Sequence, residues 1–185
     1  MIPFFYRYFL CFLPTEAEVR AHIAAIAEKV DFGPAPQPLP SDRWHLTLCV
    51  IAERALRDME LVACLVAELD VAGLAACPVR LGRAIGGAKG TAIHGIGAQA
   101  EIRDLYHRLA ASLALLGIKP LYRESGFRPH LSLGYQPVPD QRFEMPFVWT
   151  PREIVLIKSL NGRGRHRPLA RWRLQEPVQA ELLFA

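Results

Sequence analysis

Cysteine is scarce in this chain and is not arranged as a metal site. The 185 residues include four cysteines, which are Cys11, Cys49, Cys64 and Cys77. No two of them form a C-x-x-C pair, and the histidine spacing that accompanies cysteine in zinc sites is absent from the sequence. We therefore expect no metal, no cofactor and no disulfide framework. Buried, reduced thiols are expected instead, which favours the cytoplasm as the location.

Long hydrophobic runs are absent as well. The apolar and aromatic segment 1–13 is shorter than a membrane span and lacks the basic region that opens a signal peptide. It leads into a helix-start signal rather than a cleavage site. We expect a buried strand there, in a soluble protein without a membrane partner.

Neither sign of charge dominates the composition. The 22 Lys and Arg residues against 18 Asp and Glu residues give a formal net charge of +4. A surplus of this size is compatible with a phosphate-bearing ligand but does not identify one. Because 51% of the residues are hydrophobic and no long linker divides the chain, residues 1–185 are predicted to form one domain. No obligate protein partner is indicated.

Strand and helix patterns alternate along the chain. A capping box of Thr15 and Glu18 predicts the start of a helix. The apolar face of that helix consists of Val19, Ile23, Ile26 and Val30, spaced three or four residues apart. Further helices are predicted over 55–69 and 101–116, and strands over 3–13, 43–51, 79–85, 91–96, 129–135, 153–160 and 170–174. A glycine-rich turn at 86–90 joins two of these strands, and the whole order predicts an α+β fold.

Two strands carry nearly identical tetrapeptides. The first is His45-Leu-Thr47-Leu and the second is His130-Leu-Ser132-Leu. Successive side chains of a strand point to opposite faces. Each histidine therefore shares a face with its hydroxyl residue, while the leucines face the core. The repeat also indicates two related lobes.

This pairing suits the hydrolysis of a cyclic phosphodiester. The reaction needs a base that activates water and an acid that protonates the departing ribose oxygen. Two imidazoles fill both roles near neutral pH, because unperturbed histidine titrates near pH 6.5. The hydroxyls of Thr47 and Ser132 are predicted to hydrogen-bond the non-bridging phosphate oxygens, so the chemistry needs no metal. One such histidine alone is typical of a half-buried structural residue, whereas two matching copies favour catalysis.

Around these motifs the sequence resembles the two-histidine (2H) phosphoesterases, specifically the LigT-like RNA 2′,3′-cyclic phosphodiesterases, historically called 2′-5′ RNA ligases. The resemblance covers nearly the whole chain. Residues 8–14 (YFLCFLP) look like the opening strand of that family, and residues 154–159 (IVLIKS) look like a late strand. Residues 43–48 (RWHLTL) resemble the first signature, and residues 127–134 (FRPHLSLG) resemble the second.

The resemblance implies an α+β fold of two similar lobes, each with an antiparallel sheet flanked by helices, facing each other across a central cleft. It implies that His45 and Thr47 come from one lobe and His130 and Ser132 from the other. In such families the first histidine is usually the general acid and the second the general base. The sequence itself does not distinguish these roles.

Two basic features accompany the motifs. Arg128 precedes His130 by two residues and is predicted to reach the phosphate. The segment 158–173 is rich in arginine, and it is interpreted either as an RNA-steering surface or as a solvated loop before an edge strand. The family continues here through a basic turn into a His-Tyr pair, whereas this chain has His166-Arg167-Pro168. The missing tyrosine leaves the preferred substrate open.

The sequence thus predicts a metal-independent cyclic phosphodiesterase. His45 and His130 are the predicted catalytic residues, and Thr47, Ser132 and Arg128 the predicted phosphate-binding residues. The expected reaction converts the 2′,3′-cyclic phosphate end of an RNA to a 2′-phosphate. One alternative is a small cyclic nucleotide or ADP-ribose cyclic phosphate as substrate, and another is a non-catalytic RNA-binding module.

Overall fold

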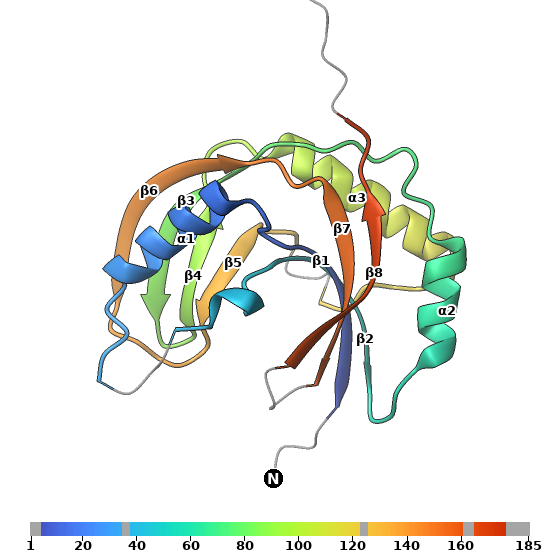
Figure 1. The fold of residues 1–185 in the computed structure, drawn as a ribbon, viewed down its shortest axis with the longest axis horizontal. Helices are drawn as coiled ribbons and strands as arrows, with labels where there is room; N and C mark the ends of the chain where they lie inside the picture. Colours follow the sequence, from blue (N-terminus) through green and yellow to red (C-terminus); the bar gives the residue numbers. More distant parts are fainter. Residues whose placement is uncertain (1–4, 35–37, 123–125, 161–164, 177–185) are drawn as a thin grey trace, which may run out of the picture.

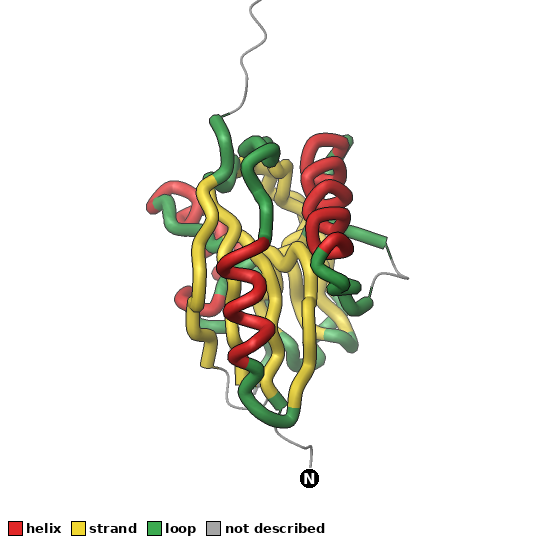
Figure 2. The backbone as a smooth tube through the Cα atoms, turned by 90° about the vertical axis from the view of Figure 1, so that its right-hand side faces the viewer, coloured by secondary structure: helices red, strands yellow, loops and turns green. Residues whose placement is uncertain are grey.

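An antiparallel sheet forms the centre of the structure, a computed structural model that describes residues 5–34, 38–122, 126–160 and 165–176 (Figure 1). Within those residues eight strands pair in the order β6-β3-β4-β5-β2-β1-β7-β8. They are β1 (Tyr6–Phe12), β2 (Leu46–Arg54), β3 (Val79–Gly87), β4 (Gly90–Gly95), β5 (His130–Gly134), β6 (Gln141–Trp149), β7 (Glu153–Leu160) and β8 (Arg165–Arg173). The helices are α1 (Ala17–Lys29), α2 (Met59–Glu68) and α3 (Ala100–Leu115), with a 3₁₀ turn η1 (Ser41–Arg43) before β2. In the turned view of Figure 2 the helices lie outside the strands.

The sheet consists of two four-stranded halves that meet between β2 and β5. These two strands are antiparallel, and Leu46 of β2 pairs with Leu131 of β5. Both leucines directly follow a motif histidine. Each half receives one strand–helix–strand unit, β1-α1-β2 or β4-α3-β5. The helices pack on the opposite halves, because α1 contacts β6 and α3 contacts β2. The predicted α+β fold with antiparallel strands is confirmed, with the halves joined in one sheet.

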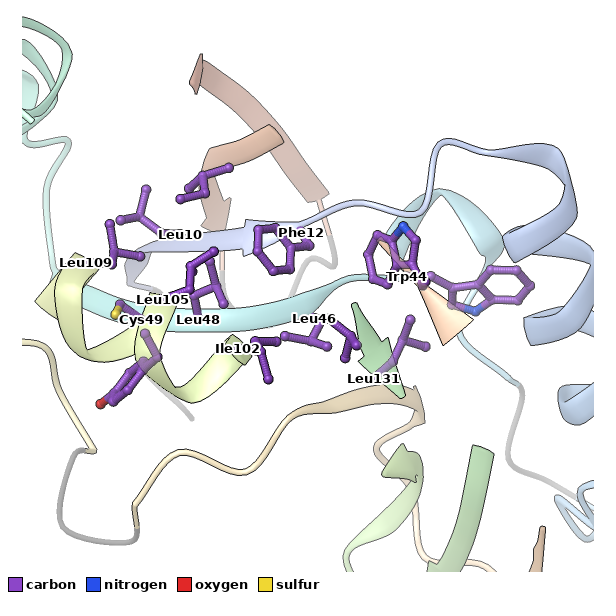
Figure 3. Packing of buried hydrophobic residues seen from close by; sticks show 14 of the residues in the cluster. Leu10, Phe12, Trp44, Leu46, Leu48, Cys49, Ile102, Leu105, Leu109 and Leu131 are labelled. Carbon is purple, nitrogen blue, oxygen red and sulfur yellow. The ribbon is translucent and has the colours of Figure 1, made fainter. Parts of the chain in front are cut away.

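The leucines of both motifs lie in the core, as the alternation predicts. Leu46, Leu48, Leu131 and Leu133 are buried, while the histidines and hydroxyl residues between them keep some exposure. Behind β2, the side chains of Leu46 and Leu48 lie close to Ile102 and Leu105 of α3 (Figure 3). Full burial of one leucine stabilises the fold by roughly 1.5–3 kcal/mol. This packing fixes the strands from behind and leaves their polar face open.

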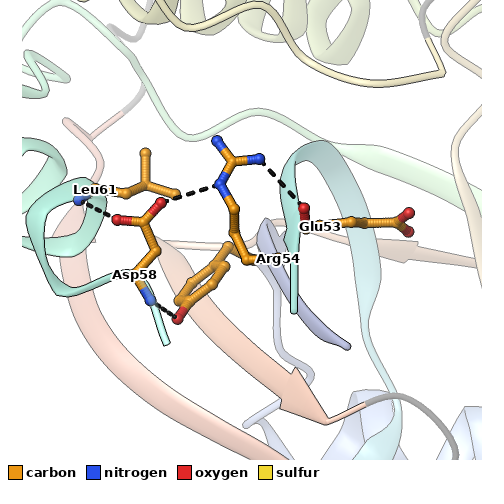
Figure 4. Close-up of polar contacts among 5 residues, drawn as sticks. Glu53, Arg54, Asp58 and Leu61 are labelled. Atoms are coloured by element: carbon orange, nitrogen blue, oxygen red, sulfur yellow. Dashed lines mark hydrogen bonds and ion pairs between the residues drawn. The ribbon is translucent and has the colours of Figure 1, made fainter. Parts of the chain in front are cut away.

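The predicted helices form, but two of their starts differ from the prediction. The capping box is wrong: α1 has Glu16 at its N-cap without a side-chain cap, and the Thr15 hydroxyl bonds to the Glu16 carboxylate instead. In the second helix the Asp58 carboxylate accepts a hydrogen bond from the amide of Leu61, so α2 begins at Met59 rather than near residue 55 (Figure 4). The apolar face of α1 is buried as predicted.

One strand is absent from the prediction. β6 lies at the edge of the sheet, contains Pro146 and alternates exposed with less exposed residues over most of its length. Proline is tolerated at such an edge because one side of the strand needs no ladder hydrogen bonds. β8 begins at Arg165, earlier than predicted, whereas the start of the first predicted strand, 3–4, lies outside the described residues. Among the helices that the structure describes, none is long and apolar enough to cross a membrane.

Candidate active site

Both motif histidines and both hydroxyl residues line one cavity. Its volume is about 420 Å³, and His45, Thr47, His130 and Ser132 all contribute to its wall. The first two precede or belong to β2, and the last two belong to β5, so the cavity straddles the junction of the two half-sheets. The structure therefore brings together the four residues that the repeated tetrapeptide singled out.

Each of the two histidines is held by an equivalent hydrogen bond, from its Nδ1 to the backbone carbonyl two residues earlier. His45 Nδ1 lies 2.8 Å from the carbonyl oxygen of Arg43, and His130 Nδ1 lies 2.9 Å from that of Arg128. A carbonyl oxygen only accepts, so each Nδ1 carries a proton and donates it. In the neutral ring the lone pair then lies on Nε2. Each histidine thus keeps the same tautomer and presents the same nitrogen for proton transfer.

His45 is kept neutral at neutral pH. Burial lowers the pKa of His45 below its usual value, and the positive charges of Arg43 and of a protonated His130 lower it further. The hydrogen bond to the Arg43 carbonyl opposes this shift without cancelling it. Near pH 7 the Nε2 atom of His45 is therefore a proton acceptor.

Two further rings enclose His45. The ring of Phe9, from β1, lies 5.0 Å from that of His45, measured between centroids. His166, from β8, meets His45 edge-on at 5.0 Å and Phe9 at 5.6 Å. Burial, with the nearby charges of His45 and Arg43, lowers the pKa of His166 to about 4. The cavity thus has an aromatic, uncharged corner of the kind that stacks a base or packs on a ribose.

Arg43 supplies a positive charge that acts on His45. It lines the cavity, and its Nε is buried without a hydrogen-bond partner among the described residues. A buried, unpaired guanidinium N–H is costly, and an anionic ligand would satisfy it. Arg7 also lines the cavity, but its guanidinium is already ion-paired with Glu53 at 2.6 Å. The geometry therefore favours Arg43 as the anion-binding side chain.

Arg128 lines a groove that adjoins the cavity. It is exposed and lines a neighbouring groove of about 760 Å³ rather than the cavity, and the contact it makes with the motif is its backbone bond to His130. This groove also contains Tyr122 and Phe127, and it shares Thr47, Val50 and His130 with the cavity. The two hollows therefore meet at the predicted phosphate site.

No cluster of three or more His, Cys, Asp or Glu residues suited to a metal ion occurs in the part of the chain that the structure describes. Of the basic segment 158–173, residues 161–164 lie outside that part. Lys158, Arg171 and Arg173 do not line the cavity, and Arg171 is ion-paired with Glu153 at 2.9 Å. Among the described residues of this segment, the ones that line the cavity are Ser159, Leu160 and His166.

Comparison with solved structures places this arrangement in a known fold. LigT from E. coli, complexed with 3′-AMP, is 24% identical, and the match covers 92% of this chain and 99% of that chain with a TM-score of 0.68. TT0787 from Thermus thermophilus is 24% identical over 92% of this chain and 99% of that chain, with a TM-score of 0.67. The MHV ns2 PDE domain is 12% identical, covering 83% of this chain and 98% of its own, with a TM-score of 0.52. The chain has the LigT-like fold.

No protein-family model and no curated protein matches the chain. Within the LigT-like fold, sequence reasoning found the paired motifs but missed Phe9, Arg43 and His166. Strand alternation did not place Arg43, because it lies in the 3₁₀ turn η1 before β2 rather than in a strand. For Phe9 no local signal existed, and His166 was noted only as part of the departure from the family's His-Tyr pair. Both reach the cavity through the sheet order.

Proposed function

We propose that this chain is a metal-independent cyclic phosphodiesterase that hydrolyses the 2′,3′-cyclic phosphate end of an RNA to a 2′-phosphate. The observation that carries the proposal is the single cavity lined by His45, His130, Thr47 and Ser132. Membership of the 2H phosphoesterases is part of the proposal. It is supported by the paired motifs and by the LigT-like fold, whose solved examples include a protein described as a phosphoesterase.

The proposed reaction divides the proton transfers between the two histidines. One histidine accepts a proton from water through Nε2 as the water oxygen attacks phosphorus. The bond between phosphorus and O3′ breaks, and the second histidine donates a proton to O3′. The product is a 2′-phosphate with a free 3′-hydroxyl. Each correctly placed acid or base contributes about 10²–10⁴-fold to the rate.

The charge that builds up on phosphate needs separate stabilisation. The hydroxyls of Thr47 and Ser132 donate to the non-bridging oxygens, and the guanidinium of Arg43 supplies a positive charge beside them. Arg128, which the sequence analysis placed in this role, is replaced in the proposal by Arg43, because Arg43 lines the cavity and has a buried N–H without a partner among the described residues.

The lowered pKa of His45 bears on which histidine is the acid. Resemblance to the family assigns the acid role to His45, yet the lowered pKa leaves its ring neutral near pH 7. An acid role then requires the bound phosphate anion to raise that pKa, as a nearby negative charge does. A base role requires no such change. The pH profile of the reaction distinguishes the two assignments.

The neighbouring groove favours an RNA over a small nucleotide. It begins at His130 and Thr47 and continues past Tyr122, Phe127 and Arg128. Tyr122 is exposed, whereas Phe127 is half-buried and stacked on Tyr106. An exposed aromatic ring and a cation beside a phosphate site are typical of surfaces that bind single-stranded nucleic acid. A small cyclic nucleotide or ADP-ribose cyclic phosphate remains the second candidate, because the cavity of about 420 Å³ by itself is of a size for one nucleotide.

The test uses an oligoribonucleotide that ends in a 2′,3′-cyclic phosphate, incubated with the protein in excess EDTA. We expect conversion to the 2′-phosphate without added metal. A parallel reaction with a mononucleoside 2′,3′-cyclic phosphate separates the two candidate substrates, since an RNA enzyme turns over the oligonucleotide with the higher kcat/KM. Unchanged substrate at high protein concentration would exclude the activity, and binding without turnover would indicate an RNA-binding module. The proposed setting is the cytoplasm, where thiols stay reduced.

A further inference from the structure

A row of titratable side chains crosses one half-sheet and ends at His130. Across neighbouring strands, Glu144 of β6 lies opposite Arg83 of β3, and Arg83 lies opposite His94 of β4. His94 in turn lies opposite His130 of β5. The outer two are joined by an ion pair, with Arg83 Nε 2.9 Å from Glu144 Oε1. His94 is therefore the residue between this ion pair and the motif histidine.

The rings of His94 and His130 are stacked. Their centroids are 5.9 Å apart, and the ring planes are inclined by only 26°. His94 lines the neighbouring groove together with His130 but does not line the cavity that holds the four motif residues. It contacts the motif histidine without reaching the proposed position of the phosphate.

His130 needs a second support of this kind. It is an exposed residue, and its hydrogen bond to the carbonyl of Arg128 fixes only Nδ1. One hydrogen bond leaves an imidazole free to tilt about the bonded nitrogen. A ring stacked on its face opposes that tilt.

The first motif histidine has an equivalent neighbour. Phe9 of β1 lies against His45 at 5.0 Å, with the planes inclined by 33°. β1 borders β2 just as β4 borders β5, so each motif histidine has a ring from its neighbouring strand against it. At His45 that ring is a phenyl group, which has no proton to exchange. The shared feature of the two sites is thus a flat ring rather than an acid or base.

We propose that His94 is a positioning residue for His130, and that its stacked ring holds the His130 imidazole in the orientation set by the Arg128 carbonyl. The proposal rests on the function proposed above, in which His130 exchanges a proton with the substrate. The charged groups that act on His94 are Arg83 from β3 and His130 from β5. Both, together with burial, lower the pKa of His94, so the supporting ring is neutral and does not repel a protonated His130.

The test compares His94→Ala and His94→Phe with the control His107→Ala, which removes an exposed histidine of α3 that does not line the cavity or the groove. For His94→Ala we expect kcat on the cyclic phosphate to fall by roughly 10- to 100-fold, as for a misoriented catalytic group, with little change in KM. His94→Phe keeps a ring and should recover most of the loss. Wild-type kcat in His94→Ala, or an equal loss in both variants, would overturn the proposal.

A second measurement does not depend on turnover. The ring nitrogen and carbon signals of His130 are followed by NMR in the wild type and in the three variants. We expect the His130 ring signals to change in His94→Ala and to stay near the wild type in His94→Phe and in the control. Should the wild type hydrolyse no cyclic phosphate, the proposed function fails, while the NMR comparison still decides whether His94 orients His130. An unaltered His130 in His94→Ala would refute the positioning role.

Discussion

His166 meets His45 edge-to-face, with ring centroids 5.0 Å apart and planes inclined by 76°. The two residues are distant in the chain and meet because the strands β8 and β2 both reach the cavity. Since the pKa of His166 is lowered to about 4, its ring is uncharged when His45 exchanges protons. The pair places a proton-transfer residue against a neutral aromatic wall.

Replacing His166 should weaken substrate binding more than it slows the chemical step. A base or ribose that packs on this wall loses its contact in His166→Ala, and base–aromatic stacking contributes about 1–3 kcal/mol. We expect KM for the cyclic phosphate to rise by at least roughly five-fold, with a smaller change in kcat. His166→Phe keeps the wall and should retain a KM close to that of the wild type. A rise in KM of equal size in both variants would show that the ring does not act as a stacking surface.

The same residue makes the fold sensitive to acid. The unfolded chain protonates a histidine near pH 6.5, whereas folded His166 does so only near pH 4, so the unfolded state binds the extra proton between these values. Stability from this group is complete above pH 6.5 and is lost as the pH falls towards 4, by about 1–2 kcal/mol for a ring that is partly screened by solvent. His166→Phe should lose less free energy of unfolding over this range than the wild type does, in urea titrations at pH 7 and pH 4.5. Equal losses in both proteins would contradict the expectation.

The catalytic assignment predicts a loss of activity without a loss of fold. His45 and His130 are not part of the buried core, so His45→Ala and His130→Ala should unfold at nearly the same urea concentration as the wild type. Each should lose at least about 100-fold in kcat/KM, because each removes a proton-transfer group. His107→Ala serves as the control with full activity. A variant of either motif histidine that keeps wild-type turnover would refute the two-histidine mechanism.

The site was predictable where its signal was local. Alternation along a strand places His45 with Thr47 and His130 with Ser132, and the structure puts all four on one cavity. The stripe of buried residues on α1 and the β3–β4 hairpin followed from spacing in the same way. In each of these cases the spacing of polar and apolar residues close together in the sequence determines which face of the strand or helix a side chain occupies.

Other features depended on contacts between distant segments. Phe9 and His166 reach His45 only because β1 lies between β2 and β7, with β8 beyond. β6 escaped prediction because an edge strand with Pro146 and alternating exposed residues resembles a loop in sequence. Arg128 was predicted on the phosphate because of its closeness in sequence to His130. Its side chain is exposed and lines the neighbouring groove, which adjoins the cavity at His130, so its phosphate role stays a prediction.

Burial is the largest cause of the lowered pKa of His45, and the charge of Arg43 should add to it. Its positive charge is one of the causes that lower the pKa of His45, whereas its backbone carbonyl, which raises that pKa, survives substitution. In Arg43→Gln the pKa of His45 should therefore rise towards its usual value, and NMR titration of the ring measures the change. If neutral His45 is the base, the acid limb of kcat/KM moves to higher pH with it. The exposed Arg57→Gln is the control, and an unchanged or lower midpoint in Arg43→Gln would contradict this origin of the shift.

The junction of the half-sheets should be the most sensitive part of the core. Leu131 is fully buried and pairs with Leu46 across that junction, and each of these leucines follows a catalytic histidine in sequence. Leu131→Ala leaves a cavity there and should lower the free energy of unfolding by about 2–5 kcal/mol in urea titration. Val148→Ala is the matched control, because this side chain of β6 is 61% exposed and its truncation leaves no cavity. Activity in Leu131→Ala should fall even under conditions where the protein stays folded, since β2 and β5 carry the histidines whose separation this contact fixes. A stability loss no larger than that of Val148→Ala would show that the two halves are held together elsewhere.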